Sequence, residues 1–199
     1  MKPVTDINQL DFSKQYTYAD YETWQFNERV ELIKGWLYIM RPAPRRWHQK
    51  IETTISSKLW NYFENNPCEV YQSPFDVRLL KNKGTNKEIN TVVQPDICVI
   101  CDLEKLDDAG CLGAPDLIVE ILSDSTAKKD YNEKFNLYEE NKVKEYWIAN
   151  PASKTIEVFS LVKKRYVSTG LFNEREGQTH VQSALFPDLK IELSVIFDY

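Results

Sequence analysis

The chain has 199 residues, of which 42% are hydrophobic and 28% charged, and its formal net charge is −5. This length and composition suffice for one sizeable core, so we predict a single domain spanning residues 1–199 and exclude a disordered chain. The negative charge counts against a broad, sequence-independent nucleic-acid surface, because such surfaces are usually basic, and it confines nucleic-acid contacts to local clusters of lysine and arginine.

The sequence predicts neither a membrane span nor a secretion signal. No apolar run approaches the ~20 residues that a membrane helix needs, and the start "MKPVTDINQLDFSKQ" lacks the apolar stretch of a signal peptide. We therefore expect a cytoplasmic protein whose four cysteines are reduced thiols. Cys98 and Cys101 form a C-x-x-C, but residues three apart in a strand point to opposite faces, so no zinc site is predicted.

The sequence of the N-terminal half predicts two helices and several strands in that part of the chain. Lys34-Gly35 separates two apolar runs, which is typical of a β-hairpin. Ile51, Ile55 and Leu59 recur at helical spacing and indicate an amphipathic helix. In chain order, the predicted elements are a short helix within 16–24, a hairpin over 29–40, a helix over 47–64, a strand over 69–80 interrupted at Pro74, and a strand over 91–101.

The C-terminal half predicts a strand, a helix and a second strand, followed by a hairpin. Candidate N-caps for this helix lie within 123–126. The elements are a loop over 102–115, a strand over 116–122, a helix at about 127–140, a strand over 144–149, a hairpin over 154–170 and one or two edge strands. Together they define an α/β (α+β) fold, a mixed sheet with one helix before its central hairpin and another after it.

Two carboxylates are predicted to meet at one end of this sheet. If the strands 96–101 and 116–121 are antiparallel neighbours, Asp96 at the start of one lies beside Glu120 near the end of the other. Two such carboxylates repel unless a cation or a proton lies between them, and oxygen-only sites suit Mg²⁺ or Mn²⁺. We therefore predict that Asp96 and Glu120 converge on a metal ion.

The helix after Glu120 offers a cation to the same site. Tyr131, Phe135 and Tyr138 mark its buried stripe, and Lys134 flanks this stripe, so its amine could reach back toward the sheet. The alternative is an exposed Asp130–Lys134 ion pair at i, i+4, which is common on helix surfaces.

Several segments of the chain resemble one known family. "QPDICVICD", "GCLGAPDLIVEILSDSTAKKDYNEKFNLYEE" and "VKEYWIANP" are similar to the Uma-two family of proposed restriction endonucleases, within the PD-(D/E)XK nuclease superfamily. The resemblance extends upstream to "RVELIKGWLYIM", His48 and "SPFDVRL", so it covers roughly residues 20–165. The order of these fragments is specific, whereas a Pro-Asp pair alone is not.

The resemblance implies a restriction-endonuclease-like core in αβββαβ order and a site that hydrolyses phosphodiesters. Asp96 and Glu120 match the two acids of the motif, and with the carbonyl of Ile121 they would hold Mg²⁺ (or Mn²⁺). The usual lysine would fall at Leu122, where this sequence departs from the pattern, and Lys134 is the matching substitute.

Three further side chains near this motif carry alternative interpretations. Glu31 matches a glutamate at the edge of the family's site, and the alternative is a solvent-facing hairpin residue. His48 is interpreted as a cap or hydrogen-bonding residue and stays outside the mechanism. Asp116 follows Pro115 and is expected to cap a turn.

The resemblance thus predicts a metal-dependent endonuclease that acts on nucleic acid, DNA in particular, as a homodimer. A different class remains open, a catalytically inactive protein that keeps the nuclease fold for interaction or nucleic-acid binding, because fold does not fix function. A hydrolase of a small phosphorylated ligand is a third option. Metal binding near Glu120 distinguishes the enzyme from the inactive protein.

Overall fold

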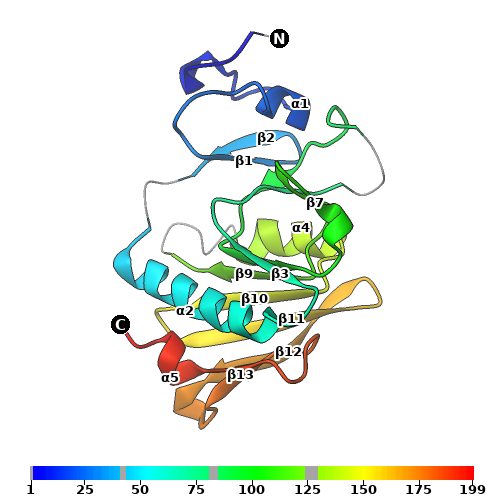
Figure 1. Ribbon diagram of the computed structural model, residues 1–199. Helices are drawn as coiled ribbons and strands as arrows, with labels where there is room; N and C mark the ends of the chain where they lie inside the picture. Colours follow the sequence, from blue (N-terminus) through cyan, green and yellow to red (C-terminus); the bar gives the residue numbers. More distant parts are fainter. Residues whose placement is uncertain (1, 41–43, 81–84, 124–129) are drawn as a thin grey trace.

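A central mixed sheet organises the molecule (Figure 1). The computed structural model describes residues 2–40, 44–80, 85–123 and 130–199, with the backbone alone at 130 and 131. From one edge to the other, the strands of this central sheet are β12 (Arg165–Asn173), β11 (Thr155–Val162), β10 (Glu145–Asn150), β9 (Leu117–Ile121), β6 (Ile97–Ile100) and β3 (Glu69–Gln72).

A second sheet, which carries the N-terminal hairpin, adjoins the first (Figure 1). Its strands, in spatial order, are β2 (Trp36–Ile39), β1 (Val30–Ile33), β5 (Val92–Val93), β4 (Val77–Arg78), β8 (Gly110–Leu112) and β7 (Leu106–Asp107). A small antiparallel pair, β13 (His180–Gln182) and β14 (Lys190–Glu192), lies near the C-terminus.

The helices are unequal in length. The long helix is α2, and the others are short: α1 (Tyr18–Tyr21), α4 (Phe135–Glu140), α5 (Leu193–Ile196), the π-helical turn η3 (Asp130–Lys134) and the 3₁₀ turns η1 (Ile7–Gln9), η2 (Leu103–Lys105) and η4 (Glu174–Glu176). Helix α2 spans Arg46–Phe63, as its apolar spacing predicts, and Thr17 lies at the N-cap of α1. Across the described ranges, no helix is long and apolar enough to cross a membrane.

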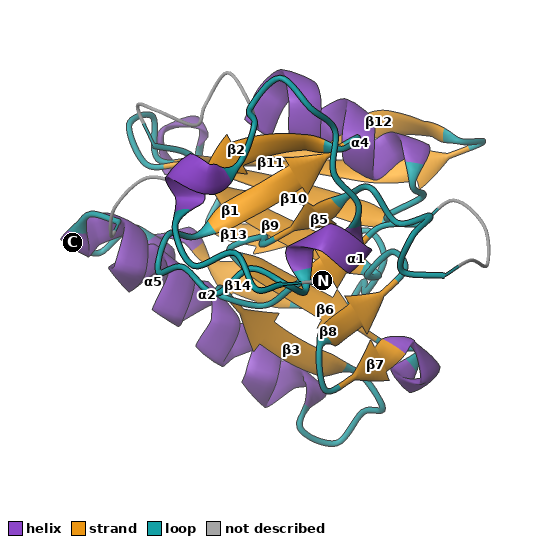
Figure 2. Cartoon of the chain, turned by 90° about the horizontal axis from the view of Figure 1, so that it is seen from above, coloured by secondary structure: helices purple, strands orange, loops and turns teal. Residues whose placement is uncertain are grey.

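Helices α2 and α4 cover opposite faces of the central sheet (Figure 2). On one face, Ile51, Ile55 and Leu59 of α2 are completely buried against β9 side chains such as Val119. Burial of each such side chain stabilises the fold by about 1.5–3 kcal/mol. On the other face, Tyr138 of α4 packs with the even-numbered residues of β6 and β9. The side chains of β9 therefore alternate between the two faces of the sheet.

The topology matches the αβββαβ order that the resemblance implies. Strands β6 and β9 are antiparallel neighbours, as predicted, and β9 runs parallel to β10. A parallel pair needs a crossover, which here contains α4. In chain order the core is α2, β3, β6, β9, α4 and β10. The predicted start of the crossover helix and the N-cap candidates over 124–126 lie outside the described residues.

The N-terminal hairpin turns at the predicted residues. Lys34 and Gly35 both have positive φ, 52° and 86°, which is the backbone that a two-residue type I′ turn requires. A side chain at Gly35 would also meet Gln15, since its Cβ would lie 2.9 Å from that of Gln15. The turn fixes the register of β1 on β2, in which Glu31 faces Tyr38.

One strand prediction and one loop prediction are wrong in part. Residues 91–101 are not one strand, because β5 belongs to the second sheet and β6 to the central one. Pro95 separates them and has no N–H to donate to a ladder. Likewise, the segment 102–115 is not only a loop, since it contains the short hairpin of β7 and β8. The interruption at Pro74 is confirmed, with β3 and β4 in different sheets.

The cysteine prediction is wrong for two of the four residues. Cys68, directly before β3, and Cys101, just after β6, form a disulfide, whereas Cys98 and Cys111 are free and buried. The structure does place Cys98 and Cys101 on opposite faces of the sheet, as strand alternation predicts. They therefore form no two-thiol site.

Candidate active site

The two predicted acids lie at the same end of neighbouring strands. In the β6–β9 register Ile97 faces Val119, so Asp96 and Glu120 are the next pair outward. The backbone N–H of Ile121 donates a hydrogen bond of 2.7 Å to Asp96 Oδ2. This bond fixes the Asp96 carboxylate at the end of the strand pair, where its side chain remains 18% exposed.

Lys134 joins this strand end from the π-helical turn before α4. Its Nζ lies 2.7 Å from Glu120 Oε1 and 3.2 Å from Glu31 Oε1, and the three side chains are at most 5% exposed. The Tyr138 hydroxyl also donates to Glu120 Oε1, over 2.7 Å. The alternative of an exposed Lys134 is therefore wrong, and the side chain of Asp130 lies outside what the structure describes.

Glu31 reaches the same amine from the second sheet. It is only 1% exposed, so the solvent-facing alternative is wrong. Strand β1 is buried along its whole length, and the Gln94 backbone N–H donates to Glu31 Oε1 over 3.1 Å. Gln94 lies in the connection between β5 and β6, which is where the chain passes from one sheet to the other. The backbone of the connection between β5 and β6 therefore holds the Glu31 carboxylate in place.

Leu122 has a packing role at the position where the superfamily has a lysine. It is 5% exposed and belongs to the apolar cluster that contains Leu137 and Tyr138 of α4. An ammonium at this position would lose its water among these apolar side chains, which is costly. The structure brings Lys134 to Glu120 instead, from the helix that covers Leu122.

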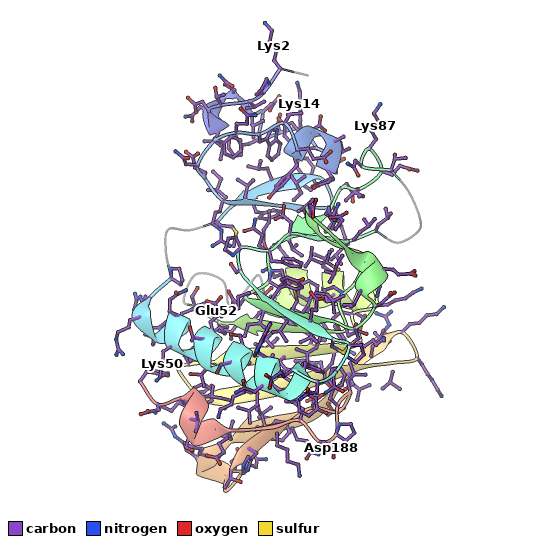
Figure 3. The ribbon with its side chains drawn as sticks, viewed as in Figure 1. Lys2, Lys14, Lys50, Glu52, Lys87 and Asp188 are labelled. Atoms are coloured by element: carbon purple, nitrogen blue, oxygen red, sulfur yellow. A yellow bond between two sulfur atoms is a disulfide. The ribbon has the colours of Figure 1, made fainter. Side chains whose placement is uncertain are left out.

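A second group of polar side chains approaches Asp96 from α2. His48 Nε2 lies 3.3 Å from Asp96 Oδ2, and His48 Nδ1 lies 3.7 Å from Glu52 Oε2. One ligand atom from each of His48, Glu52 and Asp96 can be chosen so that all lie within 4.8 Å of one another, and this group could hold a metal ion. Figure 3 labels Glu52 on α2, and Lys50, two residues earlier, is exposed.

Sequence reasoning missed Glu52. The signal was available, because His48 and Glu52 are four residues apart and therefore share a face of the predicted helix. The described residues contain no comparably close group made of Glu31, Asp96 and Glu120. Instead, the amine of Lys134 bridges Glu31 and Glu120, while His48 contacts Asp96.

Asp116 has a structural role, but its carboxylate contacts neighbouring strands instead of capping the turn after Pro115. Its carboxylate is buried, accepts a hydrogen bond of 2.7 Å from the backbone N–H of Cys101 and pairs with Lys144 Nζ at 2.6 Å. These bonds tie the start of β9 to the end of β6 and to the start of β10. Asp116 therefore lies at the opposite end of β9 from Glu120.

Burial and neighbouring charges shift two pKa values in the α2 group. Burial raises the pKa of Glu52 to about 7, and the nearby Asp96 charge adds to this effect. Burial alone would lower the pKa of His48, but the hydrogen bond to Asp96 and its charge raise it above its usual value. Both groups therefore retain protons more readily in the folded chain than in the unfolded one.

The raised pKa of Glu52 predicts a pH-dependent stability. A carboxyl group with a higher pKa in the folded state contributes stability that is complete below pH 4.5, its usual pKa, and that is lost as the pH rises through about 7. In EDTA, the stability of Glu52→Gln relative to wild type should increase as the pH rises from 5 to 8, and its advantage should be at most about 3 kcal/mol.

Urea unfolding over pH 5–8 measures this difference. Glu64→Gln is the matched control, because Glu64 ends the same helix in an exposed position. If the wild-type and Glu52→Gln curves stay parallel across this pH range, the raised pKa of Glu52 is wrong.

Known structures include the same fold. A crystal structure of a "putative nuclease belonging to DUF820" from Anabaena variabilis superimposes with a TM-score of 0.70, covering 92% of this chain and 98% of that one at 15% identity. At this identity the match concerns the fold alone. The chain therefore has the same fold as that protein, and the αβββαβ order of its core is the one that the resemblance implies.

Sequence comparison identifies the family. Residues 18–195 match the Uma2 family, whose description is "Putative restriction endonuclease". The protein slr1290 of Synechocystis sp. is 25% identical over 143 residues, which is 70% of this chain and 71% of that protein. The chain belongs to the Uma2 family.

Proposed function

We propose that this chain is a metal-dependent endonuclease that hydrolyses phosphodiester bonds of DNA. The observation that supports it is the position of Lys134, whose amine contacts Glu120 although Leu122 stands at the usual lysine position. A protein that kept only the fold would have no need to bury a lysine against two glutamates, since a buried ion pair contributes little net stability.

The donor set at this strand end fits a hard divalent cation. Asp96 and Glu120 are carboxylates at neighbouring strand ends, and with the carbonyl of Ile121 they would hold Mg²⁺ or Mn²⁺ through oxygen alone. When bound, the ion supplies a Lewis acid that polarises a phosphate oxygen and lowers the pKa of a water molecule. The structure supports this assignment through the bond between Ile121 N–H and Asp96, which orients the carboxylate.

Lys134 would act on the charge that develops at the phosphate. Its ammonium is held between Glu31 and Glu120, so it is already oriented before substrate binds. The hydroxyl of Tyr138 donates to Glu120 and keeps that carboxylate in place. Glu31 would hold Lys134 at the edge of the site, and burial of all three limits competition from water.

Local positive charge offers a path for DNA despite the net charge of −5. Arg45, Arg46 and Lys50 are exposed at the start of α2, on the turns around His48. Arg29 is also exposed and donates to Gln94, which in turn holds Glu31. These side chains suit contacts with a phosphate backbone close to the site. A homodimer with two-fold symmetry would place one such site on each strand of the DNA duplex.

A cleavage assay with a matched variant tests the function. Supercoiled plasmid and single-stranded DNA are incubated with the purified chain in Mg²⁺, Mn²⁺ or EDTA. Wild type should nick or linearise DNA with Mg²⁺ or Mn²⁺ only, and Glu120→Gln should be at least ~100-fold slower.

Glu104→Gln, at an exposed position, is the control and should equal wild type. Equal cleavage by wild type and Glu120→Gln would reveal a contaminating nuclease. No cleavage with either metal would favour the inactive nuclease fold.

A further inference from the structure

The group of His48, Glu52 and Asp96 contains a buried nitrogen without a partner. His48 is 9% exposed at its side chain, and its Nδ1 has no hydrogen-bond partner among the residues that the structure describes. The nearest acid atom, Glu52 Oε2, is 3.7 Å away, which is too far for a hydrogen bond. Buried polar atoms without partners are rare, because each has lost its hydrogen bonds to water without replacing them. This nitrogen therefore points to a ligand between His48 and Glu52.

The chemistry of the group selects the kind of ligand. Two carboxylates and one imidazole surround the position, so a cation fits and an anion does not. Mg²⁺ and Ca²⁺ bind oxygen, whereas an imidazole together with carboxylates suits Mn²⁺, Co²⁺ or Zn²⁺. Three protein ligands leave further coordination positions for water or for a phosphate oxygen, as in catalytic sites.

We propose that His48, Glu52 and Asp96 bind a divalent transition-metal ion, at a position separate from the oxygen-only site of Asp96 and Glu120. Ligand atoms around such an ion are about 3.4 Å apart when the metal–ligand bonds are ~2.1 Å. The three side chains already place their ligand atoms within 4.8 Å of one another.

Asp96 is the residue that the two positions share. Its two oxygens allow it to face His48 on the α2 side while it also serves the site of Glu120, which is the arrangement of paired-metal phosphodiesterases. The proposed transition-metal site rests on the proposed endonuclease function only in this sharing of Asp96 between two metal positions. Metal binding to His48 and Glu52 itself requires no cleavage of DNA.

Titration of the full chain with Co²⁺ tests the site, because the visible absorption of Co²⁺ reports nitrogen and oxygen ligation. Metals are first removed with EDTA, and Zn²⁺ binding by calorimetry gives a second measurement. Wild type should bind one Co²⁺ or Zn²⁺ in the presence of excess Mg²⁺. Glu52→Gln should weaken this binding by at least 10- to 100-fold, while Glu120→Gln and Glu64→Gln should retain it.

Glu52→Gln is expected to fold, because its amide oxygen can still accept the bond that Gln49 donates to Glu52. His48→Gln is the second variant and should show the same loss. Equal Co²⁺ binding by wild type and Glu52→Gln would overturn the proposal. The proposal would also be wrong if Glu120→Gln lost Co²⁺ binding while Glu52→Gln kept it.

The outcomes also separate this proposal from the proposed function. Cleavage with Mg²⁺ but no Co²⁺ site would refute the transition-metal site alone. A Co²⁺ site without cleavage would refute the endonuclease alone.

Discussion

Lys134→Met should slow DNA cleavage by about 10²–10³-fold, the size typical of removing one electrostatic stabiliser of a transition state. The substitution keeps most of the apolar stem of the side chain and removes the ammonium, which lies 2.7 Å from Glu120 and 3.2 Å from Glu31. Affinity for Mg²⁺ should persist, because Asp96, Glu120 and the Ile121 carbonyl are unchanged. Rate and metal affinity are measured by single-turnover cleavage and by calorimetry.

The same variant should also be less stable. Loss of one partner from a buried ion pair costs about 3–5 kcal/mol, and the lower end is expected here because Tyr138 and the Gln94 N–H still donate to the two glutamates. Added Mg²⁺ should restore part of this loss, since an ion that binds the folded state stabilises it. Urea unfolding with and without Mg²⁺ measures both effects.

Lys34→Met is the matched control. Lys34 pairs with Glu140 at 3.0 Å, but the two side chains are 55% and 36% exposed. Such a pair contributes about 0–1 kcal/mol, and the substitution should leave cleavage at the wild-type rate. If Lys134→Met cuts DNA as fast as Lys34→Met, Lys134 is not the catalytic cation.

Local sequence patterns predicted the parts of the fold that depend on periodicity and turn chemistry. The alternation of Leu117, Val119 and Ile121 defines the face that meets α2, and it places Glu120 on the other face. Lys34-Gly35 defines the hairpin turn. These features are local, because each depends on residues within about one turn or one strand. The single-domain organisation of residues 1–199 stays a prediction.

The errors arose where distant segments decide the structure. Gln94 and Pro95 lie where the chain leaves one sheet for the other. The Gln94 N–H bonds to Glu31, which is 63 residues away in the sequence, and local patterns do not indicate such a contact. The disulfide joins Cys68 and Cys101, which are 33 residues apart, and neither residue type nor spacing specifies that contact. For Glu52, helical spacing indicates a shared face with His48, but it does not indicate Asp96, which lies just before β6.

The candidate site was predictable in part for the same reason. The proximity of Asp96 and Glu120 could be predicted, because they lie on consecutive strands whose antiparallel pairing indicates the register. The reach of Lys134 to Glu31 depends on the packing of the second sheet against the crossover helix. Spacing alone left Lys134 open between this site and an exposed ion pair, and only the resemblance to a family suggested Glu31.

Asp96→Asn should abolish cleavage and the binding of both metals, a larger loss than that of Lys134→Met, Glu52→Gln or Glu120→Gln. Asparagine keeps the size of the side chain, and its amide oxygen can still accept the 2.7 Å bond from Ile121 N–H, so the fold should persist. The variant removes the charge that both metal positions share. Mn²⁺ should raise the melting temperature of wild type and leave that of Asp96→Asn unchanged.

Asp188→Asn is the control, because Asp188 is exposed and lies at a distance from the site (Figure 3). The three site variants should differ in which metal they lose. Glu52→Gln should lose only Co²⁺ binding at the α2 group, and Glu120→Gln should lose only Mg²⁺ binding at the other position. Asp96→Asn alone should lose both. Retention of either metal by Asp96→Asn would mean that the carboxylate at the start of β6 is not the shared ligand, and the two-position arrangement would be wrong.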